Sequence, residues 1–183
     1  VMLRQISSLA KWYSTCENVE TELDYLFSRL APNDWLLEKL DRSIISETEI
    51  SDAASPELAA IRRKIHRAEL QLRETLDKIV KNKTTQQYLQ ETNVTIRDGR
   101  FVLPVKTEYR GQVSGLVHDT SATGQTIFIE PMAVVEANND IRILQGKEQE
   151  EIERIIRELC ADCGDYADIL CENYKICAEL NLY

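Results

Sequence analysis

The chain has 183 residues, which suits one ordinary domain or one long domain with an insert, and its 43% apolar residues suffice for a hydrophobic core. Charged residues make up 29% of it, against only 6 Gly and 4 Pro, a composition typical of long solvated helices and not of a disordered tail. The formal net charge of −9 excludes a surface that binds nucleic acid everywhere, because phosphate binding needs clustered Lys and Arg.

The sequence shows neither a membrane-spanning run of about eighteen apolar residues nor a secretory signal. We therefore expect a cytoplasmic protein with no membrane partner. Its 5 cysteines are an odd number and fit reduced thiols better than the disulfide framework of a secreted protein. Because the sequence begins within an apolar pattern and ends without a helix stop signal, we also expect a fragment of a longer protein.

The first part of the chain is predicted to be helical. Apolar residues recur at spacings of three and four from Met2 to Cys16 and from Val19 to Leu30, which predicts two helices or one bent helix. Pro32-Asn33-Asp34 supplies a break and a cap before a short helix from Trp35 to Ile44. Residues 46–54 are predicted to form a loop.

Two long helices are predicted further along. Ser55-Pro56-Glu57 is a strong helix start, because Ser caps free amides, Pro is tolerated at the first position and Glu favours the positive helix end. The apolar stripe that follows runs to about Lys83. A second stripe begins after Pro131 and reaches Cys177. It lapses at residues 145–151, which indicates a solvated face, a bend or both.

Between these helices lies a segment rich in glycine and β-branched residues. The predicted strands are Val94–Arg97, Phe101–Leu103, Val113–Val117 and Thr126–Ile129. Asp98-Gly99 is the preferred pair for a tight hairpin turn, and Pro104 fits an edge strand or a strand end. The predicted fold class is therefore mainly α with a small antiparallel β insert. The simplest architecture is an antiparallel coiled-coil arm with the sheet at its far end, as a tip and not as a core.

The first predicted hairpin is basic within an acidic chain, which is the best sign of a contact with a polyanion. Its four cations fall close together, against the two acids Asp98 and Glu108. The cations are Arg97, Arg100, Lys106 and Arg110. The alternative is that scattered surface charges only keep a small sheet soluble.

A turn rich in Ser and Thr, with Gly115 and Gly124 beside it, could let backbone amides approach phosphate groups. Its candidate nucleic-acid-binding side chains are His118, Thr120, Ser121 and Thr123. The alternative is that these residues only form the turn.

Three kinds of catalytic or metal site can be set aside. His118, Asp119 and Ser121 are neighbours on one turn, so their side chains do not converge as a catalytic triad does. The last four cysteines spread over about five turns of one predicted helix and cannot enclose a tetrahedral zinc ion. The sequence also lacks the G-x-x-x-x-G-K-[ST] motif of a phosphate-binding loop. We therefore expect no catalytic residue, metal site or cofactor within this chain.

Three segments resemble the bacterial MutS-II family, relatives of the mismatch-repair MutS proteins. The central segment, residues 96–142, reads IRDGRFVLPVKTEYRGQVSGLVHDTSATGQTIFIEPMAVVEANNDIR. ASPELAAIRRKI precedes it and EIERIIREL follows it. The resemblance extends over essentially the whole chain.

The resemblance implies a helical core and a long antiparallel coiled-coil lever arm that carries a clamp-like β tip. It divides the chain into a helical core region at residues 1–54, a first lever helix at 55–92, the β tip at 93–130 and a long return lever helix at 131–183. The family's P-loop ATPase domain and its small Smr-type nuclease domain are expected outside this chain.

The resemblance further implies a dimeric ATPase linked to DNA binding, to suppression of homologous recombination and to the splitting of collided ribosomes. The arm and tip would grip DNA or ribosomal RNA, while the full-length homodimer would bind ATP and Mg²⁺ outside this chain. Endonuclease activity would belong to the Smr-type domain. Two alternatives stay open: a coiled-coil dimerisation scaffold that contacts only protein, and a free-standing enzyme, which the lack of a convergent site disfavours.

Overall fold

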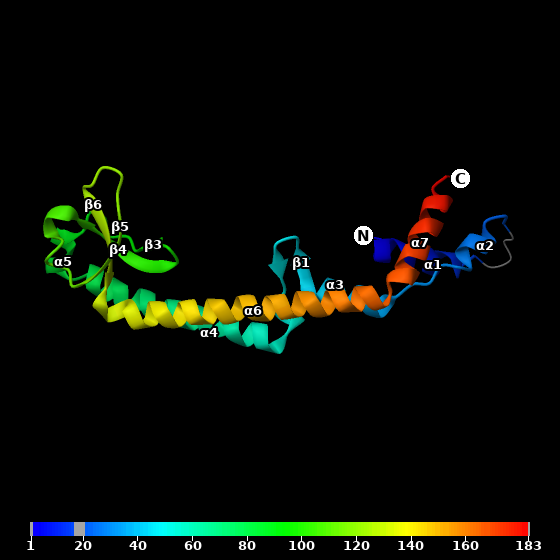
Figure 1. Ribbon diagram of the computed structural model, residues 1–183, viewed down its shortest axis with the longest axis horizontal. Helices are drawn as coiled ribbons and strands as arrows, with labels where there is room; N and C mark the ends of the chain where they lie inside the picture. The colour runs from blue at the N-terminus through cyan, green and yellow to red at the C-terminus, as the bar shows by residue number, and fades with distance from the viewer. Residues whose placement is uncertain (1, 17–20, 183) are drawn as a thin grey trace. The chain divides into compact units, whose positions relative to one another are not determined.

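The computed structural model describes residues 2–16 and 21–182, and it is mainly helical with small antiparallel sheets (Figure 1). The predicted fold class, mainly α with a small β insert, is therefore confirmed. The chain divides into two compact units. The terminal unit comprises residues 1–58 and 151–183, and the central unit comprises residues 59–150.

The elements alternate between long helices and short strands. The helices are α1 (Met2–Tyr13), α2 (Asp24–Phe27), α3 (Asp34–Ser43), α4 (Pro56–Val80), α5 (Lys83–Tyr88), α6 (Val135–Asp165) and α7 (Ala167–Leu180). The strands are β1 (Ile44–Ser46), β2 (Glu49–Ile50), β3 (Thr95–Arg97), β4 (Arg100–Lys106), β5 (Gly115–Thr120) and β6 (Thr126–Pro131), and 3-10 turns lie at Asp52–Ala54 (η1), Thr107–Tyr109 (η2) and Met132–Val134 (η3). Among the described residues, none of the helices combines the length and the apolar character needed to cross a membrane.

The terminal unit follows the predicted apolar stripes in part. Asn33 caps α3 as predicted, because its side chain accepts a hydrogen bond from the amide of Leu36. The helix predicted from Val19 to Leu30 is reduced to the single turn α2, and Val19 lies outside the described residues. The apolar residues of this segment are buried together although they do not form a long helix. That cluster is Ile6, Leu26, Leu30 and Ile176.

The predicted loop at residues 46–54 is partly ordered, which corrects that expectation. β1 and β2 form a short antiparallel hairpin, and η1 follows it. The β-branched pair Ile44 and Ile45 favours extended backbone at its start. The amide of Ser51 donates to the carbonyl of Ser43 at 2.8 Å and closes the segment.

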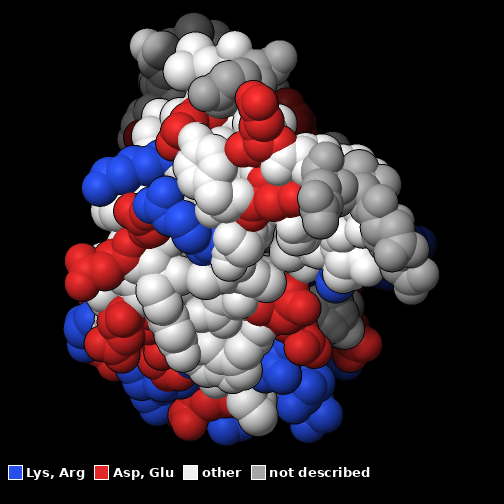
Figure 2. All heavy atoms as spheres, turned by 90° about the vertical axis from the view of Figure 1, so that its right-hand side faces the viewer, with Lys and Arg blue, Asp and Glu red and all other residues white. Residues whose placement is uncertain are grey.

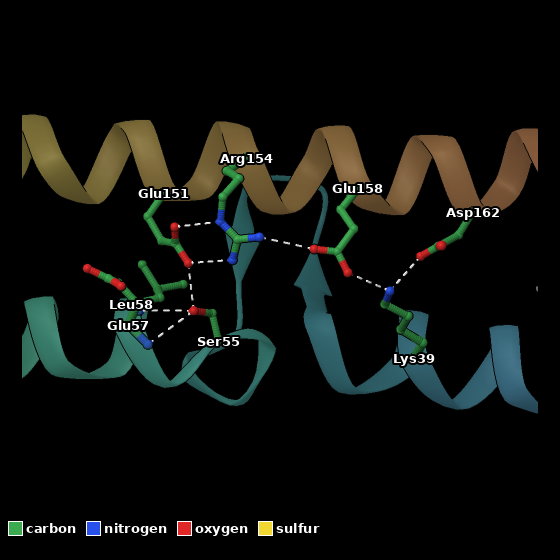
Figure 3. Close-up of polar contacts among 8 residues, drawn as sticks. All are labelled: Lys39, Ser55, Glu57, Leu58, Glu151, Arg154, Glu158 and Asp162. Atoms are coloured by element: carbon green, nitrogen blue, oxygen red, sulfur yellow. Dashed lines mark hydrogen bonds and ion pairs between the residues drawn. The ribbon is translucent and has the colours of Figure 1, made fainter.

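A chain of ion pairs holds α3 against α6 in the terminal unit (Figure 3). The ammonium of Lys39 on α3 lies 2.7 Å from the carboxylate of Glu158 and 2.6 Å from that of Asp162, both on α6. Glu158 also accepts a 3.1 Å bond from Arg154, whose guanidinium donates two further bonds to Glu151. Charged residues on adjacent turns of α6 therefore form ion pairs with each other and with Lys39 of α3.

Ser55 caps the start of α4, which confirms the predicted helix start, and it also joins this helix to the series of ion pairs on α6. Its hydroxyl oxygen accepts bonds from the amides of Glu57 and Leu58, at 3.1 and 3.3 Å. The hydroxyl itself donates to the Glu151 carboxylate at 2.6 Å. Hydrogen bonds from Arg154 and Ser55 lower the pKa of Glu151 from 4.5 to about 2.

In the central unit, α4 and α6 lie side by side and antiparallel (Figure 1). Arg62 of α4 donates to Glu148 of α6 at 2.7 Å. Further along, Leu76 and Val80 of α4 share a buried cluster with Ile141 of α6. Because residue numbers rise along one helix as they fall along the other, the predicted antiparallel pairing is confirmed within this unit.

The sheet of the central unit shares a hydrophobic core with the helices, which corrects the expectation that it is not part of a core. Its strand order is β3-β4-β6-β5, with every neighbouring pair antiparallel. One face of the sheet is apolar, and burying it against α4 and α6 removes that apolar area from water. The buried cluster consists of Leu72, Leu76, Val80, Leu89, Phe101, Leu103, Val105, Ile127, Ile129, Val134 and Ile141.

The β3–β4 hairpin confirms the predicted turn but not the predicted role of Pro104. Asp98 and Gly99 have φ values of 49° and 74°, as a tight hairpin turn requires. Pro104 lies in an interior strand and not at an edge. It is tolerated because its carbonyl accepts a bond from Gln90 on the side away from β6, so its missing amide also faces away from the β4–β6 ladder.

The long apolar stripes are divided among more helices than predicted. The first stripe ends with α4, and Asn82 starts the separate helix α5 by accepting a bond from the Thr84 amide. The second stripe is shared by α6 and α7, which are separated at Tyr166. Since α6 is unbroken through residues 145–151, the lapse of the stripe there marks a solvated face.

The shared core of the central unit can be tested at Leu72, which is 1% exposed. Leu72→Asp buries a charge without a partner, so we expect the free energy of unfolding to fall by roughly 4–5 kcal/mol. The matched control is Leu70→Asp on the same helix, at a side chain that is 49% exposed, where the change should stay within about 0.5 kcal/mol. Urea denaturation followed by circular dichroism measures both, and equal effects would contradict the packing described.

The depressed pKa of Glu151 predicts a defined pH dependence of stability. The folded state holds this carboxylate ionised, so its contribution is complete above pH 4.5 and is lost as the pH falls toward about 2. Glu151→Gln should therefore be less stable than the parent above pH 4.5, with the difference shrinking as the pH falls. Glu150→Gln, at an exposed neighbour, should show no such convergence in the same denaturation series. A constant difference for Glu151→Gln would contradict the assignment.

Candidate nucleic-acid interface

The register of the sheet divides the predicted site residues between two faces. Directly opposed residues in antiparallel strands point to the same face, and Arg97 is opposed to Arg100 as Pro104 is to Phe128. Along β4 and β6 these residues alternate with those that pack against α4, and several of them are buried as well. We call this second face the Arg97 face, and it carries Thr95, Arg97, Arg100, Val102, Pro104, Lys106, Thr126, Phe128 and Glu130.

Two predicted nucleic-acid-binding residues, Arg100 and His118, are brought together at a buried carboxylate. Glu130 is 0% exposed, and Arg100, itself 16% exposed, donates to its two oxygens at 2.8 and 3.1 Å. His118 Nε2 lies 2.5 Å from Glu130 Oε2, and the Asn138 amide donates to Oε1 at 2.8 Å. Because a buried charge requires such partners, Arg100 and His118 are held inside the unit.

Strand β5 reaches Glu130 through two local features. The register of β5 against β6 shifts between Val117 and Asp119, so His118 lies at an irregularity of the strand pairing. Gly115 is opposed to Pro131, and a Cβ on it would lie 2.2 Å from the carbonyl oxygen of Glu130. Gly115 was predicted to let the backbone approach phosphate. In the structure it instead lets β5 and β6 approach each other closely. The strand predicted at residues 113–117 begins later, at Gly115.

The guanidinium of Arg97 lies over an aromatic ring. Its guanidinium carbon is 4.2 Å from the centre of the Phe128 ring, and its Nε is 3.7 Å from the carboxylate of Asp119. The Arg97 side chain is nevertheless 45% exposed. It is the predicted cation that combines a fixed orientation with access to solvent.

Lys106 and Arg110 lie at the other end of β4 and just beyond it. Lys106 donates to the carbonyl of Gln87 at 3.2 Å, and its ammonium lies 5.9 Å from the ring centre of Tyr109. Arg110 is exposed and makes no ion pair with any residue in the ranges 2–16 and 21–182. These two cations, unlike Arg100, have no buried carboxylate to compensate them.

The turn after β5 satisfies much of its own hydrogen bonding. The amide of Thr120 donates to Asp119, that of Gly124 to the carbonyl of Ser121, and that of Thr126 to the Ser121 hydroxyl, at 2.7, 2.8 and 3.0 Å. These amides are therefore not free to approach phosphate. Among the predicted site residues here, Thr120 and Thr123 are exposed and Ser121 is half-buried.

Glu130, Asn138 and Phe128 were not predicted from the sequence. A charged residue inside the apolar strand Thr126–Pro131 is the one signal for Glu130, because such a residue needs buried partners. Neither Asn138 nor Phe128 carries a comparable signal. Their roles depend on which strands and helices meet.

Charges on the terminal unit are mixed in sign. Figure 2 looks onto the side of α1, α2 and α7, where Lys and Arg alternate with Asp and Glu around other residues. Ion pairs join Arg4 to Asp41 at 2.8 Å and Arg29 to Glu172. Such pairing leaves little net positive field on that side.

Cysteines and acids do not combine into a metal site within the described residues, where no group of three or more His, Cys, Asp and Glu side chains could hold an ion. All five cysteines are free. Burial raises the pKa of the Cys163 and Cys177 thiols, so these groups stay protonated and unreactive at neutral pH.

The buried carboxylate predicts a large effect of a small substitution. Glu130→Gln removes the charge that compensates Arg100, and we expect the free energy of unfolding to fall by roughly 3–5 kcal/mol. Glu108→Gln, at an exposed acid of the same unit, should change it by less than about 0.5 kcal/mol. Denaturant titrations measure both. A double replacement, Arg100→Met with Glu130→Leu, should recover part of the loss, and no recovery would argue against charge compensation as its cause.

The chain is similar to several curated proteins, although no family model matches it. "Endonuclease MutS2" of Acetivibrio thermocellus is 45% identical over 184 residues, which cover 98% of this chain. The protein of the same name from Ruminiclostridium cellulolyticum is 47% identical over 165 residues, 90% of this chain. That of Clostridioides difficile is 48% identical over 144 residues, 79% of this chain.

These matches cover only 23%, 21% and 18% of the three relatives, so the chain spans less than a quarter of the curated proteins that it matches. Over that part, the similarity includes both helical segments and the sheet between them, as the signature segments indicated. The resemblance found in the sequence is thereby confirmed, and the chain belongs to the MutS2 family of MutS-related proteins.

Proposed function

We propose that the central unit contacts nucleic acid through Arg97, Lys106 and Arg110. The chain as a whole carries a formal charge of −9, so a contact with phosphate must be local. Arg97 and Arg110 are exposed, and Lys106 is half-buried beside the Gln87 carbonyl. Three accessible cations on β3, on β4 and just beyond β4, within an acidic chain, are the observation that carries the proposal.

The other predicted residues take supporting roles in this proposal. The hydroxyls of Thr120, Ser121 and Thr123 add hydrogen-bonding groups next to β5. Arg100 and His118 act indirectly, because they hold Glu130 and thereby keep β4, β5 and β6 in fixed positions. Phosphate contacts of this kind position a nucleic acid without selecting its sequence.

Family membership extends the proposal to the full-length protein. The relatives are named endonucleases, enzymes that cleave nucleic acids. We infer that α4 and α6 form a coiled-coil lever arm and the sheet its clamp-like tip, in a homodimeric ATPase that binds ATP and Mg²⁺ outside this chain. Its targets are DNA, during suppression of homologous recombination, and ribosomal RNA, during the splitting of collided ribosomes.

A second candidate is a dimerisation scaffold that contacts only protein. It is favoured by an open apolar groove between α1 and α7 of the terminal unit, whose walls include Met2, Leu9, Trp12 and Tyr174. Binding through such a surface depends weakly on salt, whereas phosphate contacts weaken steeply as salt rises.

Charge reversal separates the two candidates. Arg97, Lys106 and Arg110 changed together to Glu should abolish binding of duplex DNA and ribosomal RNA by the full-length protein, because three attractive phosphate contacts become repulsive. For the parent, the slope of log affinity against log salt should be about −2 to −3, the value for three contacts. Filter binding at several salt concentrations measures both quantities.

The control is a second triple variant that changes the net charge by the same amount at a site on α4. Arg63, Lys64 and Arg67 are exposed on α4 of the central unit, and reversing them to Glu should weaken binding far less. If the two triple variants bind alike, the effect is one of net charge and the site is not at the sheet. A flat salt dependence of the parent would favour the protein-contacting scaffold.

A further inference from the structure

A hollow of about 400 Å³ opens on the Arg97 face of the sheet. Its volume lies near the lower end of the roughly 300–1,000 Å³ typical of small-molecule sites. Thr95, Arg97, Pro104 and Phe128 of the sheet line it, together with residues of the segment that leads into β3.

One wall of the hollow is formed by Arg97 and the Phe128 ring beneath its guanidinium. The Arg97 guanidinium lies 4.2 Å from the Phe128 ring centre, and Asp119 holds it from the side. A guanidinium plane that is supported by a ring on one side and open on the other can stack a nucleobase, as arginine planes do in RNA recognition. Lys could not supply such a plane, because its ammonium is a point charge.

The charges around the hollow suit a neutral ligand better than a phosphate. Glu91 lines it, and Asp119 offsets the charge of Arg97. The remaining polar lining includes the side-chain amides of Gln90 and Asn93, which can both donate and accept hydrogen bonds. A base edge offers donors and acceptors to amides, and a carboxylate can accept a bond from an exocyclic amino group.

A second hollow, of about 460 Å³, lies next to the first, because Gln90 belongs to the walls of both. Lys106 lines it together with the acid Glu108, so it supplies one cation next to the base site.

We propose that the hollow at Arg97 is a binding site for a single unpaired nucleobase of RNA or DNA. The inference rests on the proposed function, to which it adds the substrate class: nucleic acid with a base available outside the stack. A fully paired duplex reaches the cations but leaves the hollow empty. Stacking and edge contacts then favour loops, bulges and strand junctions over uniform duplex.

The test compares two probes that differ by one base. A short RNA duplex with one bulged fluorescent aminopurine is set against the same duplex fully paired, and DNA copies of both distinguish the two sources. The full-length protein should bind the bulged probe about tenfold more tightly, within the range that one stacked base supplies. Binding should also change the fluorescence of the bulged base.

Arg97→Lys keeps the positive charge but removes the planar guanidinium group on which a base would stack. It should abolish both the preference for the bulge and the fluorescence change, whereas any weakening of the Arg97 phosphate contact should lower the affinity for both probes alike. Arg142→Lys, at an exposed arginine on α6, is the control and should retain both. A preference seen with RNA only or DNA only supports the site and names its source.

Failure of this inference and failure of the proposed function look different. Equal affinity of the parent for bulged and paired probes, with normal salt dependence, overturns the base site and leaves the phosphate contacts standing. A bulge preference that survives Arg97→Lys also overturns it. Absence of binding to every probe at low salt overturns both.

Discussion

A buried carboxylate loses its hydrogen bonds to water and needs partners within the protein to replace them. The partners of Glu130 come from three different elements. Arg100 comes from β4, His118 from β5 and Asn138 from α6, while Glu130 itself belongs to β6. Moving any one of these elements away removes a partner from the buried charge, which costs more than the loss of one exposed ion pair. The positions of Arg100 and His118 follow from this constraint.

The sheet and the helices of the central unit also share one close-packed interior. Residues of α4 and α6 and residues of β4 and β6 fill it together, so a displacement of the sheet must be absorbed by the helices beneath it. A ligand held on the Arg97 face would therefore act on α4 and α6 through packing alone. The proposed role of these helices as a lever needs such a rigid connection at its tip.

Features that depend on neighbouring residues in the sequence were predictable. The Asp98-Gly99 turn and the helix start at Ser55 arise from local backbone preference and local hydrogen bonds, and both were found. Features that depend on tertiary partners were missed. The interior position of Pro104 depends on Gln90, and Arg100 looks like a surface cation until its buried partner is known. Sequence identified where the basic segment lies, but not which of its cations remain accessible.

The contact between Asn138 and Phe101 shows how a sheet can be ended by a helix. Its side-chain amide accepts a bond from the Phe101 amide at 3.0 Å and donates one to the Phe101 carbonyl at 3.1 Å, as a neighbouring strand would. Continuing the β4–β6 register places Pro131 opposite Phe101, and Pro has no amide proton to give. Asn138 therefore replaces one rung of the ladder. Unpaired backbone groups on a strand can pair with a strand of another chain, and Asn138 closes that opportunity at Phe101.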